Sequence, residues 1–216
     1  ARSAPRPAAH PAATPAHGIT AATTTRRREP QDADNSTLAK FREWVDRSRR
    51  NLRTDRLDLV QLHCPPTAVY SRDEVYDGLD TLVAEGAIAS YGVSVETVDE
   101  ALTAIARPHV ATVQIILNAF RLKPLDAVLP AASDAGVGVL ARVPLASGLL
   151  SGKYTKDTTF AADDHRTYNR DGSAFDVGET FSGVDFETGV QAAAEFTTLV
   201  HDVVGEDLTP GQVAGA

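Results

Sequence analysis

The stretch "RLDLVQLHCPP", Arg56 to Pro66, decides the fold, because it joins a strand pattern to an abrupt polar end. Its apolar run, Leu57 to Leu62, is typical of a short buried strand. A histidine, a cysteine and two prolines follow, and proline cannot donate to a sheet ladder. His63 therefore stands where the predicted strand ends.

Strand patterns alternate with helix patterns along the rest of the chain. Besides the first strand at 57–62, we expect strands at 87–95, 110–117 and 136–143. One helix is expected before the first strand and one between each pair of consecutive strands, the last of them at 124–135. Strand beginnings near 57, 87, 110 and 136 recur at the length of one βα unit. This alternation predicts an α/β fold with a parallel sheet and outer helices.

Helix-start signals support these boundaries. Asn35 or Ser36 is the expected N-cap of the first helix, and Ser71 with Glu74 forms an expected capping box for the second. Thr97 with Glu100 predicts another capping box. Further signals are Gly86, which is expected to end the second helix, and the Thr209–Pro210 pair, which is expected to open a helix near the last residues.

Composition limits the function classes. With 216 residues and 43% hydrophobic content, the chain is long enough for one sizeable domain. A net charge of −8 argues against nucleic-acid and anionic-membrane partners, which are themselves polyanions. Cys64, the single cysteine, cannot form an internal disulfide, and no apolar run reaches the roughly 18 residues of a membrane span. We therefore expect a cytoplasmic protein.

The first 34 residues differ from the others. They hold five of the 12 prolines and no aromatic residue, and their only large aliphatic side chain is Ile19. Such a segment buries too little apolar surface to offset its ordering entropy. We expect residues 1–34 to be a disordered or vestigial leader, with a transit peptide or a linker as alternatives, and residues 35–216 to form the domain.

Ligands of parallel βα folds lie at the carboxyl ends of the strands, so the strand ends carry the functional signal. His63 is open there to two interpretations, a functional group or a ring bonded to a backbone carbonyl. Cys64 is interpreted as a small buried hydrophobe, since no neighbouring cation favours its thiolate. No set of strand-end ligands predicts a metal site.

Four strand ends taken together resemble the aldo-keto reductase family. They read "QLHCPP", "YGVSVET", "VQIILNAF" and "LARVPLASGLLSGKY", and they occur in the family's order. The similar region runs from about Asn35 to Ala216 and corresponds to the middle of the family's barrel. The resemblance implies a partial (β/α)8 TIM-type barrel and an NAD(P)H-dependent oxidoreductase that reduces aldehydes or ketones to alcohols.

The resemblance also implies roles for individual residues. His63 matches the active-site histidine that donates a hydrogen bond to the substrate carbonyl, and such a donor stabilises the charge that develops on oxygen. Ser94 and Gln114 match the side chains that hold the nicotinamide carboxamide. Arg142 occupies the position of an aromatic residue that stacks on the nicotinamide, while Val95 replaces a common asparagine.

The segment from Pro144 to Lys153 is the expected pyrophosphate site. Its small residues allow backbone amides to approach a phosphate, and the alternative is a mobile glycine-containing loop without a ligand. The complete expected cofactor-binding set is Ser94, Gln114, Arg142, Pro144, Leu145, Ser147, Gly148 and Leu149. The implied cofactor is NADPH, with NADH not excluded, and the implied substrate is a small carbonyl compound. No motif identifies that substrate or indicates an oligomeric state.

Three other catalytic groups of the family, a tyrosine, a lysine and an aspartate, belong to strands that precede the histidine strand. No tyrosine precedes Leu57, and Lys40 is the only lysine there. Asp163 and Tyr168 have the family's spacing but follow the fourth strand, so we interpret them as a coincidence. The last strand of the family, with the basic residues that select NADP, is also expected to be absent.

The chain is therefore expected to be an incomplete, inactive copy of a reductase. A non-catalytic remnant that binds a partner through exposed sheet edges is the alternative. A metal-dependent barrel hydrolase is a weaker third hypothesis, because only His63 is available as a strand-end ligand.

Overall fold

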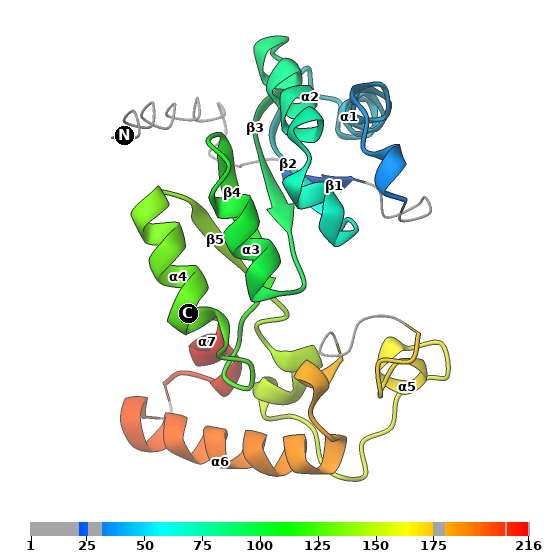
Figure 1. Cartoon of the computed structure of the whole chain (residues 1–216). Coiled ribbons are helices and arrows are strands. Elements are labelled where there is room, and N and C mark those ends of the chain that lie inside the picture. Colours follow the sequence, from blue (N-terminus) through cyan, green and yellow to red (C-terminus); the bar gives the residue numbers. More distant parts are fainter. Residues whose placement is uncertain (1–21, 26–31, 175–179, 206, 216) are drawn as a thin grey trace. The chain divides into compact units, whose positions relative to one another are not determined.

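The computed structural model describes residues 22–25, 32–174, 180–205 and 207–215, which form two compact units (Figure 1). The first unit comprises the described residues up to Ile115 together with Ala127–Leu140. The second unit comprises Ile116–Asp126 and the described residues from Ala141 onward. Each unit has its own hydrophobic core.

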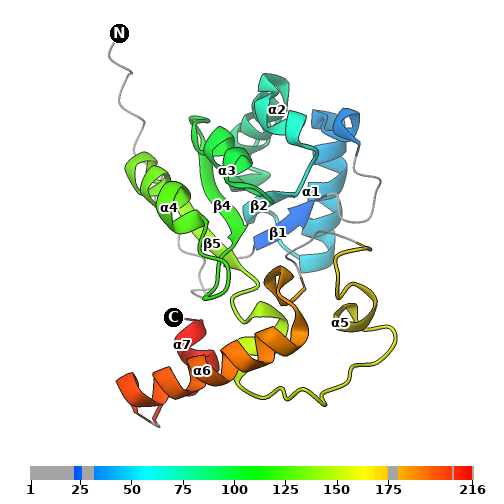
Figure 2. The same cartoon turned by 60° about the horizontal axis from the view of Figure 1, so that its bottom comes forward.

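A five-stranded sheet is the centre of the α/β fold, and its strand order follows the chain. The strands are β1 (Ala22–Thr25), β2 (Leu57–His63), β3 (Ile88–Ser94), β4 (Val110–Ile116) and β5 (Gly138–Arg142). The pairs β1–β2, β2–β3 and β3–β4 are parallel. Helices α1 (Leu38–Leu52), α2 (Asp73–Ala84), α3 (Val98–Ile105) and α4 (Pro124–Ala135) connect or precede the strands (Figures 1 and 2). The four strands expected from the sequence are confirmed.

The two faces of β2 to β4 differ in chemistry because neighbouring residues of a strand point to opposite faces. One face carries Val60, Leu62, Tyr91, Val93, Val113 and Ile115, all buried in one cluster with residues of α1 to α4. Burial of each aliphatic side chain there contributes about 1.5–3 kcal/mol. The opposite face, named the polar face below, carries Gln61, His63, Ser90, Gly92, Ser94, Thr112 and Gln114, together with the apolar Leu57, Leu59 and Ile116.

Strand β1 was not expected, because it lies inside the segment interpreted as a leader. Its sequence "ATTT" pairs in parallel with Leu59 to Leu62, and the Thr25 hydroxyl donates to the carbonyl of Gln61 at 3.4 Å. The leader prediction rested on the scarcity of aromatic and large aliphatic residues, whereas threonine is β-branched and fits a pleated surface well. Residues 1–21 and 26–31 lie outside the described residues, so for them the domain boundary at residue 34 stays a prediction.

The helix-start predictions are partly confirmed. Thr97 and Glu100 form the expected capping box of α3. Thr37, and neither Asn35 nor Ser36, caps α1. The box predicted at Ser71 is wrong, because Ser71 ends the short 3-10 helix η2 (Thr67–Ser71) and Arg72, the N-cap of α2, makes no capping bond with its side chain.

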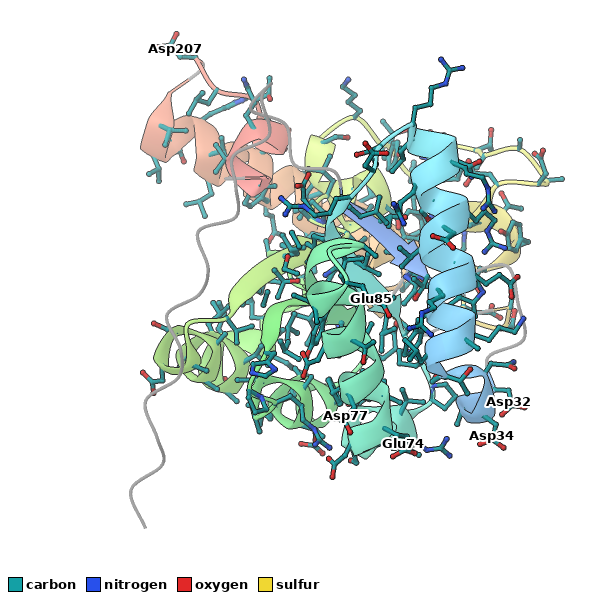
Figure 3. The ribbon with its side chains drawn as sticks, turned by 90° about the horizontal axis from the view of Figure 1, so that it is seen from above. Asp32, Asp34, Glu74, Asp77, Glu85 and Asp207 are labelled. Atoms are coloured by element: carbon teal, nitrogen blue, oxygen red, sulfur yellow. The ribbon has the colours of Figure 1, made fainter. Side chains whose placement is uncertain are left out.

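Charged side chains link the helices of the first unit at its surface. Figure 3 shows Asp32, Asp34, Glu74, Asp77 and Glu85 on the outside of this unit. Arg42 of α1 forms an ion pair with Glu85 at the end of α2 and thereby lowers the pKa of that carboxyl. Arg72 reaches Asp34 at 3.2 Å. These exposed ion pairs link the two ends of α2 to α1 and to the residues just before α1.

The second unit is mainly helical. Its elements are η3 (Ala146–Ser151), α5 (His165–Tyr168), η4 (Phe181–Gly183), α6 (Phe186–Val204) and α7 (Pro210–Ala214). Leu149, Leu150, Phe181 and Phe186 are buried in its core. Thr209 caps α7 with Pro210 as its first residue, which confirms that helix start. Among the described residues, no helix combines the length and apolar character of a membrane span.

Buried tyrosines of the first unit make its stability sensitive to alkaline pH. Burial raises the pKa of Tyr76 to about 12, and it also raises the pKa of Tyr70 and of Tyr91. The unfolded chain loses these phenol protons near pH 10, before the folded chain does. The free energy of unfolding is therefore maximal below about pH 10 and falls as the pH rises toward about 12.

Urea unfolding measured between about pH 8 and 11 checks this expectation. The variant Tyr76→Phe keeps the ring but removes the titrating hydroxyl, so its free energy of unfolding should fall less steeply with pH. Equal slopes for the variant and the unmodified chain would contradict the assignment.

Candidate active site

Three of the expected site residues form one row across the sheet. His63 is in register with Ser94, and Ser94 is in register with Gln114, so the three share the polar face near the carboxyl ends of β2, β3 and β4. Ser94 is fully buried, whereas His63 and Gln114 are half-buried. The Ser94 hydroxyl donates to Oε1 of Gln114 at 3.0 Å. The row joins a hydroxyl, an amide and an imidazole at the end of the sheet where parallel folds bind ligands.

A hydrogen-bond chain continues from this row deeper into the polar face. Nε2 of Gln114 donates to Oε1 of Gln61 at 3.4 Å, and Nε2 of Gln61 donates to the Thr112 hydroxyl at 3.3 Å. The Cys64 thiol joins the other end by donating to the Ser94 hydroxyl at 3.4 Å. Sequence analysis missed Gln61 and Thr112. The available signal was the position of each residue, two before His63 or Gln114 and hence on the same face.

A glycine, Gly92, makes this chain of hydrogen bonds possible. It lies two residues before Ser94 on β3. Gln61, Gly92 and Thr112 are in register on three neighbouring strands. A Cβ at Gly92 would collide with the Thr112 hydroxyl and lie 2.5 Å from the Thr112 carbonyl oxygen. The absent side chain lets Gln61 reach across β3 to β4. This explains why a strand of buried residues contains a glycine.

The residues that follow β2 hold the end of β3 in place. Cys64 adopts a left-handed backbone conformation, with φ of 39°, and its N–H donates to the carbonyl of Ser94 at 3.1 Å. The buried Tyr70 hydroxyl donates to the same carbonyl at 2.8 Å. Two donors therefore fix the end of β3 beside His63. Tyr70 is held as a structural phenol, and its burial raises its pKa.

The remaining expected residues lie in the second unit. Arg142 ends β5, and its carbonyl accepts from the N–H of Leu117 at 3.3 Å. Val143, Ala146 and Ser147 have positive φ without being glycine, as do Phe181 and Ser182. Such conformations cost energy and gather at functional sites.

Specific contacts hold this strained segment in place. Nδ2 of Asn118 donates to the Val143 carbonyl at 2.9 Å and to the Ser182 hydroxyl at 2.7 Å. The Phe181 N–H donates to the Ser147 hydroxyl at 3.2 Å. The Leu149 side chain is buried in the core, so only its backbone is suited to a ligand. Leu145 and Pro144 are half-buried.

The row of His63, Ser94 and Gln114 thus lies in one unit, and Arg142 with the Pro144–Leu149 segment in the other. Their convergence at one mouth of the sheet stays a prediction. Tyr168, the last residue of α5, also lies in the second unit and is 49% exposed.

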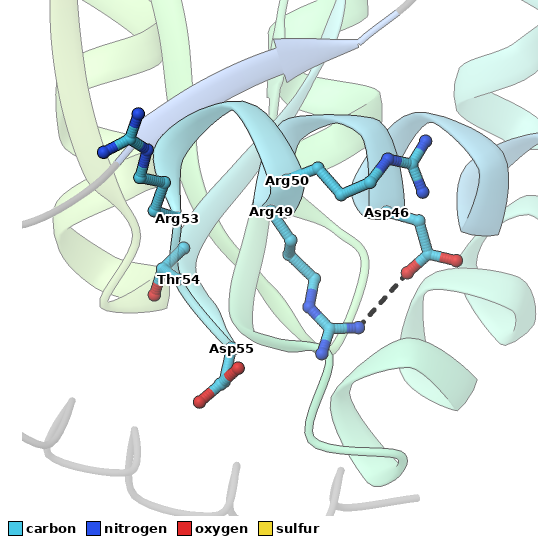
Figure 4. Close-up of a pocket in the computed structure, with 6 residues that line it drawn as sticks. All are labelled: Asp46, Arg49, Arg50, Arg53, Thr54 and Asp55. Carbon is cyan, nitrogen blue, oxygen red and sulfur yellow. Dashed lines mark hydrogen bonds and ion pairs between the residues drawn. The ribbon is translucent and has the colours of Figure 1, made fainter.

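A surface cavity of about 380 Å³ lies at the opposite end of β2. Asp46, Arg49, Arg50, Arg53, Thr54 and Asp55 line it, at the end of α1 and just before β2 begins (Figure 4). Arg49 is paired with Asp46 at 3.2 Å, and the other side chains spread apart (Figure 4). Apart from Thr54, its lining is charged, unlike the row of His63, Ser94 and Gln114.

The described part of the chain contains no cluster of potential metal ligands. No three histidine, cysteine, aspartate or glutamate side chains come together there in a way that could hold an ion. The row instead offers a hydroxyl, an amide and an imidazole, and the hydroxyl and the amide suit an uncharged polar group such as a carboxamide.

The fold and the row define a parallel α/β protein with polar side chains gathered at its strand ends. The family model described as Aldo/keto reductase family matches residues 22–215, so the chain belongs to this family. It is 34% identical over 131 residues to the Aldo-keto reductase YhdN of Bacillus subtilis, a match that covers 61% of this chain and 39% of that protein.

Two solved structures illustrate the fold. Glycerol dehydrogenase AKR11B4 from Gluconobacter oxydans is 31% identical, with a TM-score of 0.65, over 83% of this chain and 51% of that chain. An aldo/keto reductase from Klebsiella pneumoniae in complex with NADP and acetate is 23% identical, with a TM-score of 0.53, over 71% and 51% of the two chains. The chain thus spans about half the length of these two structures and 39% of the length of the Bacillus subtilis protein.

The close approach at Gly92 predicts a large effect for a small substitution. Gly92→Ala places a methyl group against Thr112, which should destabilise the first unit by about 1–3 kcal/mol. Gly138→Ala is the matched control, because its Cβ would lie 3.4 Å from Cγ2 of the same Thr112. The control should change the free energy of unfolding by less than about 0.5 kcal/mol. Chemical denaturation measures both, and equal effects would contradict the packing described for Gly92.

Proposed function

We propose that the row of His63, Ser94 and Gln114 is the nicotinamide end of an NADPH-dependent reductase of small aldehydes or ketones. The observation that carries this proposal is the placement of the three side chains on one face at adjacent strand ends. Family membership supports it, because the resemblance of the strand ends implies that these three residues are the family's site.

Each residue of the row has a separate task in this proposal. Ser94 and Gln114 hold the carboxamide, which fixes the ring face that meets the substrate and makes the reaction effectively intramolecular. His63 donates a hydrogen bond to the substrate carbonyl oxygen, where negative charge develops. The bound cofactor supplies the hydride.

The Pro144–Leu149 segment would hold the pyrophosphate of the cofactor. The support is local: successive residues with positive φ, a glycine at position 148, and hydrogen bonds from Asn118 and Phe181 that keep the backbone in place. Curved backbone of this kind forms concave anion sites. Arg142 would lie beside the nicotinamide.

The step of the proposed reaction that these 216 residues do not support is proton donation to the substrate oxygen. Strand β1, which precedes β2, contains only alanine and threonine, and Lys40 belongs to α1. Tyr70 is buried and donates to the carbonyl of Ser94, so its proton is committed. A positioned general acid contributes about 10²- to 10⁴-fold. We therefore propose that these 216 residues alone turn over no carbonyl substrate measurably.

Three finer features belong to the same proposal. NADPH is the proposed cofactor, with NADH as the alternative. A cytoplasmic location suits the single Cys64, because a lone thiol stays reduced there. The relation to a glycerol dehydrogenase favours a small polar substrate, such as a hydroxylated carbonyl compound.

An interaction module is the second candidate function, and the exposure of β5 favours it. Gly138, Leu140 and Ala141 of this edge strand are exposed, whereas most residues of β2 are buried. Leu140 is a large apolar side chain with 38% exposure. An exposed apolar edge strand is a template for pairing with another chain.

Cofactor binding tests the proposal without requiring turnover. The purified chain should quench or shift NADPH fluorescence on titration, and Gln114→Ala should weaken binding by roughly tenfold, the value of about one hydrogen bond. Ser90→Ala is the matched control for Ser94→Ala, because it removes a hydroxyl from the same strand and face that instead donates to the Asp58 carbonyl at 2.7 Å. Only Ser94→Ala should weaken binding.

The outcomes separate the two candidates. Absence of NADPH binding, together with self-association of the chain, would favour the interaction module and refute the cofactor site. Carbonyl turnover that disappears in His63→Ala would instead refute the proposed inactivity, while it would retain the site.

A further inference from the structure

We propose that Gln61 is a positioning residue that fixes the orientation of the Gln114 amide and thereby selects a carboxamide as the group bound at this end of the sheet. The second half of this inference rests on the proposed function, whereas the first half concerns the protein without a ligand. Gln61 is only 2% exposed, so its amide cannot rely on bulk water for its hydrogen bonds.

The contacts of Gln61 use both ends of its amide. Its Nε2 donates to the Thr112 hydroxyl at 3.3 Å, and its Oε1 accepts from Nε2 of Gln114 at 3.4 Å. Oε1 of Gln114 then accepts from the Ser94 hydroxyl at 3.0 Å. Donation therefore runs in one direction, from the Ser94 hydroxyl through the Gln114 and Gln61 amides to the Thr112 hydroxyl.

The two amides cannot turn independently. If the Gln114 amide turned alone, its oxygen would face the oxygen of Gln61, and the hydrogen bond between the two amides would be lost. A buried polar group that loses its partner costs about 1–3 kcal/mol. Gln61 thus couples the orientation of Gln114 to the hydroxyl of Thr112 on the same strand, β4.

The orientation matters because a carboxamide and a ketone differ in one group. With its Nε2 bound to Gln61, Gln114 presents Oε1 at the Ser94 end of the row, and a carbonyl oxygen has a second lone pair for a further donor. The NH₂ of a nicotinamide carboxamide can supply that donor. The methyl ketone of a 3-acetylpyridine analogue cannot.

Packing alone does not explain a glutamine here. A leucine of similar volume would fill the same buried position without the cost of burying an amide. The neighbouring Gly92 provides the space through which Gln61 reaches Thr112, since a side chain at position 92 would collide with that hydroxyl. Glutamine and glycine together serve the hydrogen bond.

Nuclear magnetic resonance of the chain without cofactor tests the first half. In Gln61→Leu, the side-chain NH₂ signals of Gln114 should shift and exchange with water at least about tenfold faster, because the acceptor is gone. Gln61→Glu keeps an acceptor oxygen and should largely preserve the signals. Gln191→Leu is the control, because Gln191 lies on α6 in the second unit and donates to Glu195. Unchanged Gln114 signals in Gln61→Leu would overturn the inference.

Binding of NADPH and of its reduced 3-acetylpyridine analogue tests the second half of the inference, the selection of a carboxamide. The unmodified chain should prefer NADPH by roughly tenfold, about one hydrogen bond, and the preference should fall toward one in Gln61→Leu but persist in Gln61→Glu. A preference that is equal in the unmodified chain and in Gln61→Leu would overturn the selection of a carboxamide. If the unmodified chain binds neither dinucleotide, the proposed function and this selection both fail, while the resonance experiment still decides the role of Gln61.

Discussion

The parallel register of β2, β3 and β4 is the constraint on which the candidate site depends. It aligns Leu62 with Val93 on the face that packs against the helices, and His63 with Ser94 on the polar face. A slip of one residue would move every apolar side chain of a strand to the polar face. The hydrophobic core therefore holds the register, and the register places the imidazole, hydroxyl and amide next to one another.

A second constraint acts within the other unit, where backbone strain is balanced by side-chain hydrogen bonds. Val143 and Ser182 both have positive φ, and both accept from Nδ2 of the buried Asn118. Strain of this kind persists only where the surroundings determine the conformation. Both units thus use a buried amide, Gln61 in one and Asn118 in the other, to hold a segment that the proposed function requires.

Most of the strands and helices were predictable from periodicity, because they repeat with the length of a βα unit and some helices begin at recognisable N-caps such as Thr97. Strand β1 did not, since a run of threonines carries a weak apolar signal and depends on pairing with β2. Gln61 was missed because its importance comes from Gly92 and Thr112 on other strands, and cross-strand contacts of this kind require the register.

A crystal structure of the chain with NADPH bound would test the central claim most directly. The account predicts the nicotinamide carboxamide within hydrogen-bonding distance of Ser94 and Gln114, with His63 on the same side of the sheet as the ring. A dinucleotide bound at the arginine-lined cavity before β2, or a nicotinamide that does not contact the polar face, would contradict it.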